Sequence, residues 1–241
     1  MFKEEFILAG RRILLWADKK VLAGSDRPAC LLVQTLGRHE LPSVEREVAL
    51  IAGSAGGEGV SFAMVFFEVF DWAVDLMPWA DPKVDRRPEV GQHAGETLHF
   101  LTDNLIPTLR QRFGELPVIL GGYSLGGLFA LWAATHSDAF AAVAAASPSL
   151  WIRDWLSYAE QHPVRAQAVY LSLGDREEHV RNTAIARVGD CVRAQYDLLR
   201  AQPNAPTCTL HWETGGHFAD NDGRLSRAFC WCLESLFRQQ P

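Results

Sequence analysis

Short apolar runs alternate with amphipathic segments along most of the chain. Runs of this length predict strands, because a strand covered on both faces needs no polar residue at every second position. The predicted strands are 31–33, 62–70, 117–120, 140–146, 169–173 and 207–212.

The segments between these runs have apolar residues at helical spacing. In one of them Val44, Val48 and Ile51 recur on one helical face. The preceding Ser43 is of a residue type that caps helices. The predicted helices are 43–52, 94–113 with an interruption near Pro107, 125–135, 183–202 and 225–237.

Strands that alternate with helices predict an α/β fold with a mostly parallel central sheet and helices on both faces. The first 23 residues or so predict an antiparallel pair of strands instead. A length of 241 residues fits one domain, so we expect a single domain over 1–241 without a large cap domain. In such sheets ligands bind at the carboxyl ends of the strands.

Two segments depart from this alternation. The glycine-rich patch 53–59 (GSAGGEG) lacks the Lys-Ser/Thr of a phosphate loop, so it predicts a plain turn before a strand. Segment 71–95 is long, proline-containing and charged, and it follows a predicted strand. Long loops in compact domains are often functional, so the segment is either a lid at the ligand end of the sheet or a solvated excursion.

Composition narrows the classes of function. The net charge of −6 argues against a nucleic-acid-binding protein, which needs a basic surface. Five cysteines without a CxxC motif favour a reducing compartment over a disulfide framework. The first residues lack the apolar core of a signal peptide, and no apolar run approaches the ~20 residues of a membrane span. We therefore expect a cytoplasmic protein that binds no nucleic acid and no membrane, whereas its oligomeric state is not predicted.

The sharpest chemical signal is a G-x-S-x-G motif formed by Gly122, Ser124 and Gly126. A strand is predicted directly before it and a helix directly after it, which is the context of a nucleophile elbow. This context makes Ser124 the candidate nucleophile and the Leu125 N–H a candidate oxyanion donor. The alternative is a glycine-rich turn with a capping serine.

A serine nucleophile needs a histidine to take its proton. His217 follows the last predicted strand in a loop that contains two glycines, so it can reach the carboxyl ends of the strands. His179 lies in another loop at a strand end and is the rival candidate for the base.

The imidazole in turn needs a carboxylate, which in this type of hydrolase lies between the serine and the histidine in the sequence. Three carboxylates follow the predicted strand 169–173 at the expected place. Glu177 is the preferred triad acid, Asp175 the alternative and Glu178 the third choice.

The remaining candidates concern the oxyanion hole and the substrate pocket. A second oxyanion donor is expected from the loop after the first buried strand, from the backbone of Gly37 or Leu36. Tryptophans in predicted loops offer flat apolar walls, and an arginine among them can bind a carboxylate; ordinary packing and a solvated charge are the alternatives. The pocket candidates are Trp72, Trp79, Trp151 and Arg153.

Five stretches of the chain resemble the Putative esterase family of the α/β-hydrolase superfamily, which contains enterochelin (siderophore) esterase-like and esterase D-like hydrolases. They are 71–79 (DW and MPW at its two ends), 121–127 (GGYSLGG), 146–151 (ASPSLW), 173–178 (LGDREE) and 215–217 (GGH).

This resemblance implies a hydrolase that cuts small-molecule carboxylic esters through a Ser–acid–His triad, without a metal or cofactor. It assigns the triad to Ser124, His217 and Glu177, or Asp175 in its place. A thioesterase or peptidase that uses the same triad is the alternative, and so is a non-catalytic binding protein with this fold.

Overall fold

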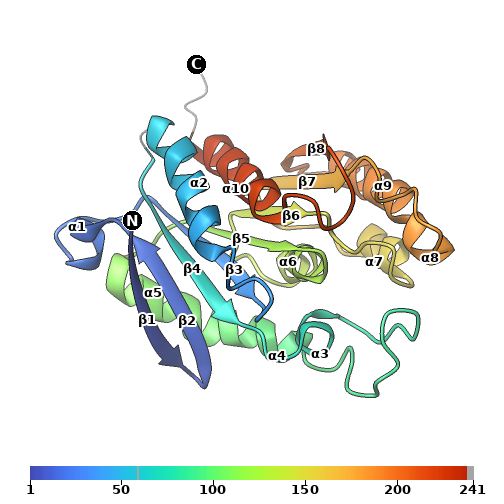
Figure 1. Cartoon of the computed structure of the whole chain (residues 1–241), viewed down its shortest axis with the longest axis horizontal. Coiled ribbons are helices and arrows are strands. Elements are labelled where there is room, and N and C mark those ends of the chain that lie inside the picture. The colour runs from blue at the N-terminus through green and yellow to red at the C-terminus, as the bar shows by residue number, and fades with distance from the viewer. Residues whose placement is uncertain (59, 238–241) are drawn as a thin grey trace.

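The computed structural model describes residues 1–58 and 60–237, and within these ranges an eight-stranded sheet forms the centre of the molecule (Figure 1). The strand order is β1-β2-β4-β3-β5-β6-β7-β8. β1 and β2 pair antiparallel with their neighbours, and the other neighbouring pairs are parallel, as the sequence predicts. The strands are β1 (Phe2–Leu8), β2 (Arg11–Ala17), β3 (Cys30–Leu36), β4 (Phe62–Glu68), β5 (Val118–Tyr123), β6 (Ala142–Ala146), β7 (Ala168–Gly174) and β8 (Thr207–Glu213).

Helices cover both faces of this sheet, as expected for an α/β-hydrolase fold. Alternate residues of a buried strand point to opposite faces. In β3, Leu31 and Val33 therefore belong to the core beneath α4 to α7 and α9, whereas Leu32 belongs to the core beneath α2 and α10. The helices are α1 (Lys19–Leu22), α2 (Val44–Glu58), α3 (Trp72–Leu76), α4 (Ala94–His99), the π-helical η1 (Phe100–Leu105), α5 (Ile106–Phe113), α6 (Leu125–His136), α7 (Trp155–Gln161), α8 (Thr183–Ala186), α9 (Val188–Ala201) and α10 (Asn221–Phe237).

One local expectation is wrong. The glycine-rich patch is not a turn, because α2 continues through Glu58; Gly59 lies outside the described residues. The apolar face of α2 is docked on the sheet, and this packing outweighs the low helix propensity of glycine.

The interruption expected near Pro107 is present. The helical stretch 94–113 contains the π-helical η1, which ends at Leu105, and Pro107 stands in the first turn of the α5 segment that follows.

The segment between β4 and α4 is held by specific hydrogen bonds, although several of its residues are exposed to solvent. Asp71 caps α3, and Arg87 from farther along the segment pairs with the same carboxylate, which lowers the pKa of Asp71 to about 2. Asp81 is buried and accepts the backbone N–H groups of Lys83 and Arg153. These bonds fix the segment next to α7, at the carboxyl ends of the parallel strands (Figure 1).

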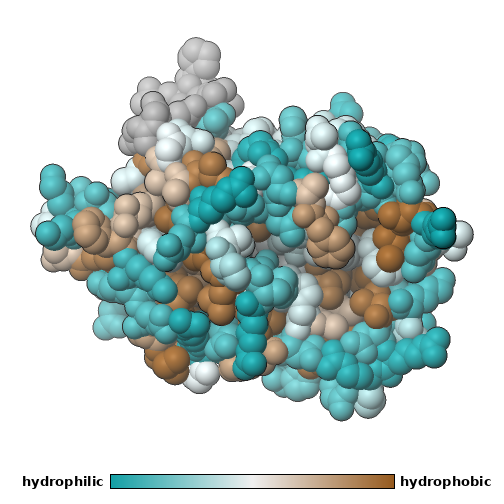
Figure 2. Space-filling view, in the orientation of Figure 1, coloured by the Kyte–Doolittle hydropathy of each residue, from teal (hydrophilic) through white to brown (hydrophobic). Residues whose placement is uncertain are grey.

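The surface shows mostly hydrophilic side chains on the face seen in Figure 2, with hydrophobic residues in separate patches. No helix of the described ranges has both the length and the apolar character to cross a bilayer.

One buried carboxyl beneath α2 has an incomplete set of partners. Glu47 is 2% exposed; its Oε2 accepts the Gln34 amide at 3.3 Å, and its Oε1 has no partner. Burial raises the pKa of Glu47 well above its ordinary value, and the negative charges of Glu40 and Asp222 add to this effect. The folded protein therefore binds a proton at Glu47 more tightly than the unfolded chain does.

Glu47→Gln is expected to stabilise the protein above neutral pH and to change little near pH 4.5. Because the Glu47 pKa is higher in the folded protein than in the unfolded chain, protonated Glu47 contributes its full stability only below the unfolded-state pKa. This contribution to the free energy of unfolding is lost as the pH rises through the folded-state pKa. The amide removes this loss, so the melting temperature of the variant should exceed that of the wild type increasingly between pH 5 and 8.5. Thermal unfolding across this range tests the prediction, and two parallel curves would contradict it.

Candidate active site

The turn between β5 and α6 presents Ser124 in a strained backbone conformation. Its φ and ψ angles are 57° and −115°, which a residue with a side chain rarely adopts. Gly122 has no room for a side chain, since a Cβ there would lie 2.4 Å from the Gly126 carbonyl carbon. A Cβ on Gly126 would lie 2.7 Å from the Thr35 hydroxyl oxygen. Gly122 is therefore required by close backbone packing and Gly126 by the neighbouring Thr35 side chain, and the serine stands at the carboxyl end of β5.

The structure brings three predicted residues into one hydrogen-bonded chain. Ser124 Oγ lies 3.0 Å from His217 Nε2, and His217 Nδ1 lies 2.6 Å from Glu177 Oε2. His217 comes from the loop after β8 and Glu177 from the turn after β7, so the chain joins the carboxyl ends of three parallel strands. The candidate acid and the candidate base each follow the end of a strand, in the chain order serine, acid, histidine that the motif predicts.

The competing candidates lie elsewhere. Asp175 accepts the Gly215 N–H at 2.8 Å and does not contact the imidazole. Glu178 pairs with Arg193 at 2.9 Å, and His179 is exposed. Of the three carboxylates after β7, the geometry therefore favours Glu177.

The second oxygen of Glu177 is surrounded by donors. Oε1 accepts the Arg224 guanidinium at 2.8 Å, the Ser147 hydroxyl at 2.7 Å and the Gly174 N–H at 2.8 Å. The side chain is only 3% exposed. Burial alone would raise the pKa of Glu177, but the hydrogen bonds from His217, Gly174 and Ser147 outweigh it and hold this pKa below its ordinary value. The carboxylate is therefore ionised at neutral pH.

Arg224 is a part of this site that sequence reasoning missed. It is fully buried, and besides Glu177 it donates to the Tyr123 hydroxyl at 3.0 Å and to the carbonyls of Thr214 and Gly216. It thus ties the acid to the loop that presents the base. An arginine near the start of an amphipathic helix resembles an ordinary surface charge, so the sequence holds no signal for this role.

The backbone N–H groups proposed for the oxyanion hole differ in whether another group already accepts their hydrogen bond. Leu125 is the first residue of α6, where a backbone N–H has no helical partner. The Gly37 N–H donates to the Glu40 carboxylate at 2.7 Å, so an oxyanion can use it only if Glu40 withdraws. Burial raises the pKa of Glu40 to about 7. Leu36, the alternative, ends β3.

The four pocket candidates lie in two places, three of them at or beside one cavity and Trp72 next to the elbow. Trp151 and Arg153 line a cavity of about 500 Å³. Trp72 packs next to the elbow, since a Cβ on Gly126 would lie 3.6 Å from its ring. Trp79 donates its indole N–H to the Arg153 carbonyl at 2.8 Å and so holds two loops together. Within the described residues no group of three or more His, Cys, Asp or Glu side chains is arranged to hold a metal ion.

The fold is similar to solved structures of esterases. Siderophore hydrolase EstA from Aspergillus nidulans superposes with a TM-score of 0.73 at 21% identity, over 98% of this chain and 95% of that one. An IroE-like serine hydrolase from Shewanella oneidensis gives 0.75 at 16% identity, over 95% and 79%. The enterobactin esterase FES from Shigella flexneri gives 0.69 at 18%, over 98% of this chain and 60% of that one. At these identities the likeness shows the fold alone.

Family membership follows from the sequence comparison. The profile of the family described as "Putative esterase" matches residues 55–204, which include Ser124 and Glu177 and end before His217. A search of curated proteins found no match. Because the profile covers more than half of the chain, the protein belongs to the Putative esterase family and has the α/β-hydrolase fold of its structural neighbours.

Proposed function

We propose that the protein is a serine hydrolase that cuts small-molecule carboxylic esters. The observation on which the proposal depends is the continuous chain of hydrogen bonds from Ser124 through His217 to Glu177. An ester is proposed over an amide or thioester because the family and the named neighbours are esterases and siderophore hydrolases.

In the proposed mechanism Ser124 Oγ attacks the ester carbonyl while His217 Nε2 takes its proton. Glu177 holds the Nδ1 proton of the ring and stabilises the imidazolium that forms. The Leu125 N–H and a donor near Gly37 stabilise the oxyanion. His217 then protonates the leaving alcohol. In the second half of the reaction His217 takes a proton from water, the water oxygen attacks the acyl carbonyl, and His217 returns the proton to Ser124 Oγ as the acid leaves.

Covalent labelling tests this proposal. A fluorophosphonate probe is expected to add once to the wild-type protein, as read by intact mass, and not to Ser124→Ala. Ser149→Ala is the matched control, because the Ser149 hydroxyl lies 3.1 Å from the Ser124 hydroxyl yet contacts no histidine. This variant should still be labelled. A folded wild-type protein that takes no label would contradict the proposal.

A further inference from the structure

A cavity of about 500 Å³ lies next to the segment that contacts the proposed nucleophile. Its wall includes Leu150 and Trp151, and the hydroxyl of the preceding Ser149 lies 3.1 Å from that of Ser124. Because successive Cα atoms are about 3.8 Å apart, the Cα of Trp151 is within about 8 Å of the Cα of Ser149. No triad residue is among the described residues that line the cavity. It is therefore a space that borders the segment in contact with Ser124 and is separate from the triad.

The most deeply buried side chains that line the cavity are apolar. Among them, Leu150, Trp155 and Cys191 are each at most 3% exposed. Trp151 is half-buried, so its indole offers a flat apolar surface to a ligand. This lining suits a planar or otherwise apolar group.

Five charged residues line the cavity, and both acidic ones are already bound. Asp81 accepts backbone N–H groups of Lys83 and Arg153, and Asp154 pairs with the Arg153 side chain at 3.3 Å. Arg153 also donates to the Ala80 carbonyl at 3.1 Å. The arginine that the sequence suggests as a carboxylate ligand is thus engaged within the protein.

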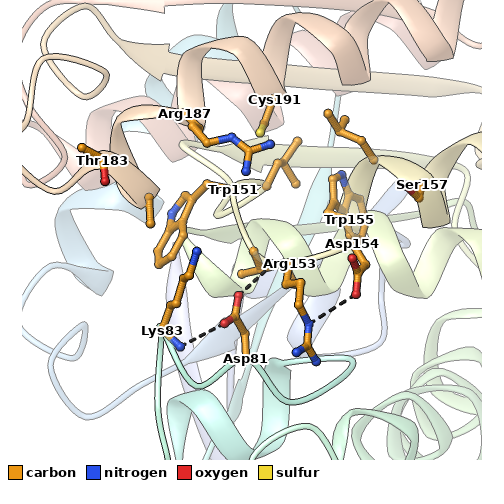
Figure 3. A pocket seen from close by; sticks show the side chains of 14 residues that line it. Asp81, Lys83, Trp151, Arg153, Asp154, Trp155, Ser157, Thr183, Arg187 and Cys191 are labelled. Carbon is orange, nitrogen blue, oxygen red and sulfur yellow. Dashed lines mark hydrogen bonds and ion pairs between the residues drawn. The ribbon is translucent and has the colours of Figure 1, made fainter.

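Lys83 and Arg187 are the cations that remain. Neither side chain forms an ion pair or a hydrogen bond with any residue in the part of the chain that the structure describes. Lys83 comes from the segment after α3 and Arg187 from the junction of α8 and α9, and both point into the cavity (Figure 3). Two unpaired positive charges that converge on one space attract an anion, and a guanidinium binds a carboxylate through two parallel hydrogen bonds.

We propose that this cavity is a substrate subsite for a negatively charged group, a carboxylate or an equivalent anion, on an apolar and preferably planar body. Arg187 and Lys83 determine the specificity, and Trp151 contacts the apolar body. The proposal rests on the ester hydrolysis proposed above. It states which residues bind the part of the ester that lies away from the scissile bond.

Matched pairs of esters test the subsite. One pair differs on the alcohol side (4-acetoxyphenylacetate and its amide) and the other on the acyl side (the p-nitrophenyl half-ester of adipic acid and its terminal amide). In at least one pair kcat/KM is expected to be about 10-fold higher for the carboxylate, mainly through KM. This preference should decrease as salt is added, because the two cations are exposed.

Variants identify the residues responsible. Arg187→Gln combined with Lys83→Gln should abolish the preference for the carboxylate, so that the two members of each pair have kcat/KM values within about 2-fold of each other. Arg187→Lys should retain part of the preference. Arg181→Gln is the matched control, since Arg181 is equally exposed and close in sequence but does not line the cavity.

The outcomes separate the two proposals. Hydrolysis of all four esters without a preference for either carboxylate would overturn the subsite and leave the esterase intact. A preference that survives the double variant would also overturn it. Failure to hydrolyse any of the esters, together with absence of fluorophosphonate labelling, would overturn the proposed function itself.

Discussion

Glu177→Gln is expected to lower kcat about 10⁴-fold, the loss typical of a triad acid replaced by its amide. Three donors converge on Glu177 Oε1, so the amide oxygen of the variant must take that position. Its NH₂ group then faces His217 Nδ1 and forces this nitrogen to accept. The ring proton moves to Nε2, where it faces Ser124 and prevents the ring from taking the serine proton.

Steady-state kinetics on an activated ester, with a melting curve to confirm folding, measure this effect. Asp175→Asn is the control, because the amide oxygen can still accept the Gly215 N–H at this exposed position. Its kcat should stay within about 3-fold of wild type. The reverse pattern, a large loss for Asp175→Asn and a small one for Glu177→Gln, would make Asp175 the acid.

Arg224→Met is expected to cost about 3–5 kcal/mol of stability, the range for breaking one side of a buried ion pair. The methionine has a similar volume but removes the cation from Glu177 and the guanidinium donor from the carbonyls of Thr214 and Gly216. For a chain of this size the melting temperature should fall by about 6–20 °C. Removal of the cation should also raise the pKa of Glu177, so kcat should fall most at the acidic end of the pH range.

Thermal unfolding and kcat between pH 5.5 and 8.5 test both parts. Arg224→Lys keeps the charge with fewer donors and should restore part of the stability and of the activity. Arg193→Met removes an exposed pair with Glu178 and should change stability by no more than about 1 kcal/mol. If the Arg224 and Arg193 variants behaved alike, the buried arginine would have no special role.

The sheet and most of the helices were predictable because their apolar periodicity is strong. The strands β3 to β7 are apolar runs that two helix layers cover. The sequence predicts each of them, and the more exposed edge strand β8, to within a few residues. The start of α10 was missed by four residues. Its first turn contains Asp222, Gly223 and Arg224, which resemble a turn in sequence but are buried in the structure. Tertiary contacts of polar groups leave no periodic signal.

The candidate site likewise contains residues that the sequence could predict and residues that it could not. Ser124 and His217 could be proposed because a motif and a strand end place them, and Glu177 could only be preferred among three neighbours. The hydrogen bond between the Gly37 N–H and Glu40 depends on how one loop folds back on itself, which no spacing rule describes. The free cations of the cavity were equally hidden, because pairing decides which charges are available, and pairing is a property of the fold.

The position of α10 in the chain has a consequence for biosynthesis. This helix packs over the neighbouring strands β5, β6 and β7. It also supplies Arg224, the cation that pairs with the buried Glu177. As the protein leaves the ribosome, serine, acid and base therefore emerge before the helix that completes their surroundings. Until then one face of the central strands stays uncovered, which is the state in which nascent chains aggregate. We expect Ser124 to become reactive towards a fluorophosphonate only when α10 has docked, so labelling reports this step of folding.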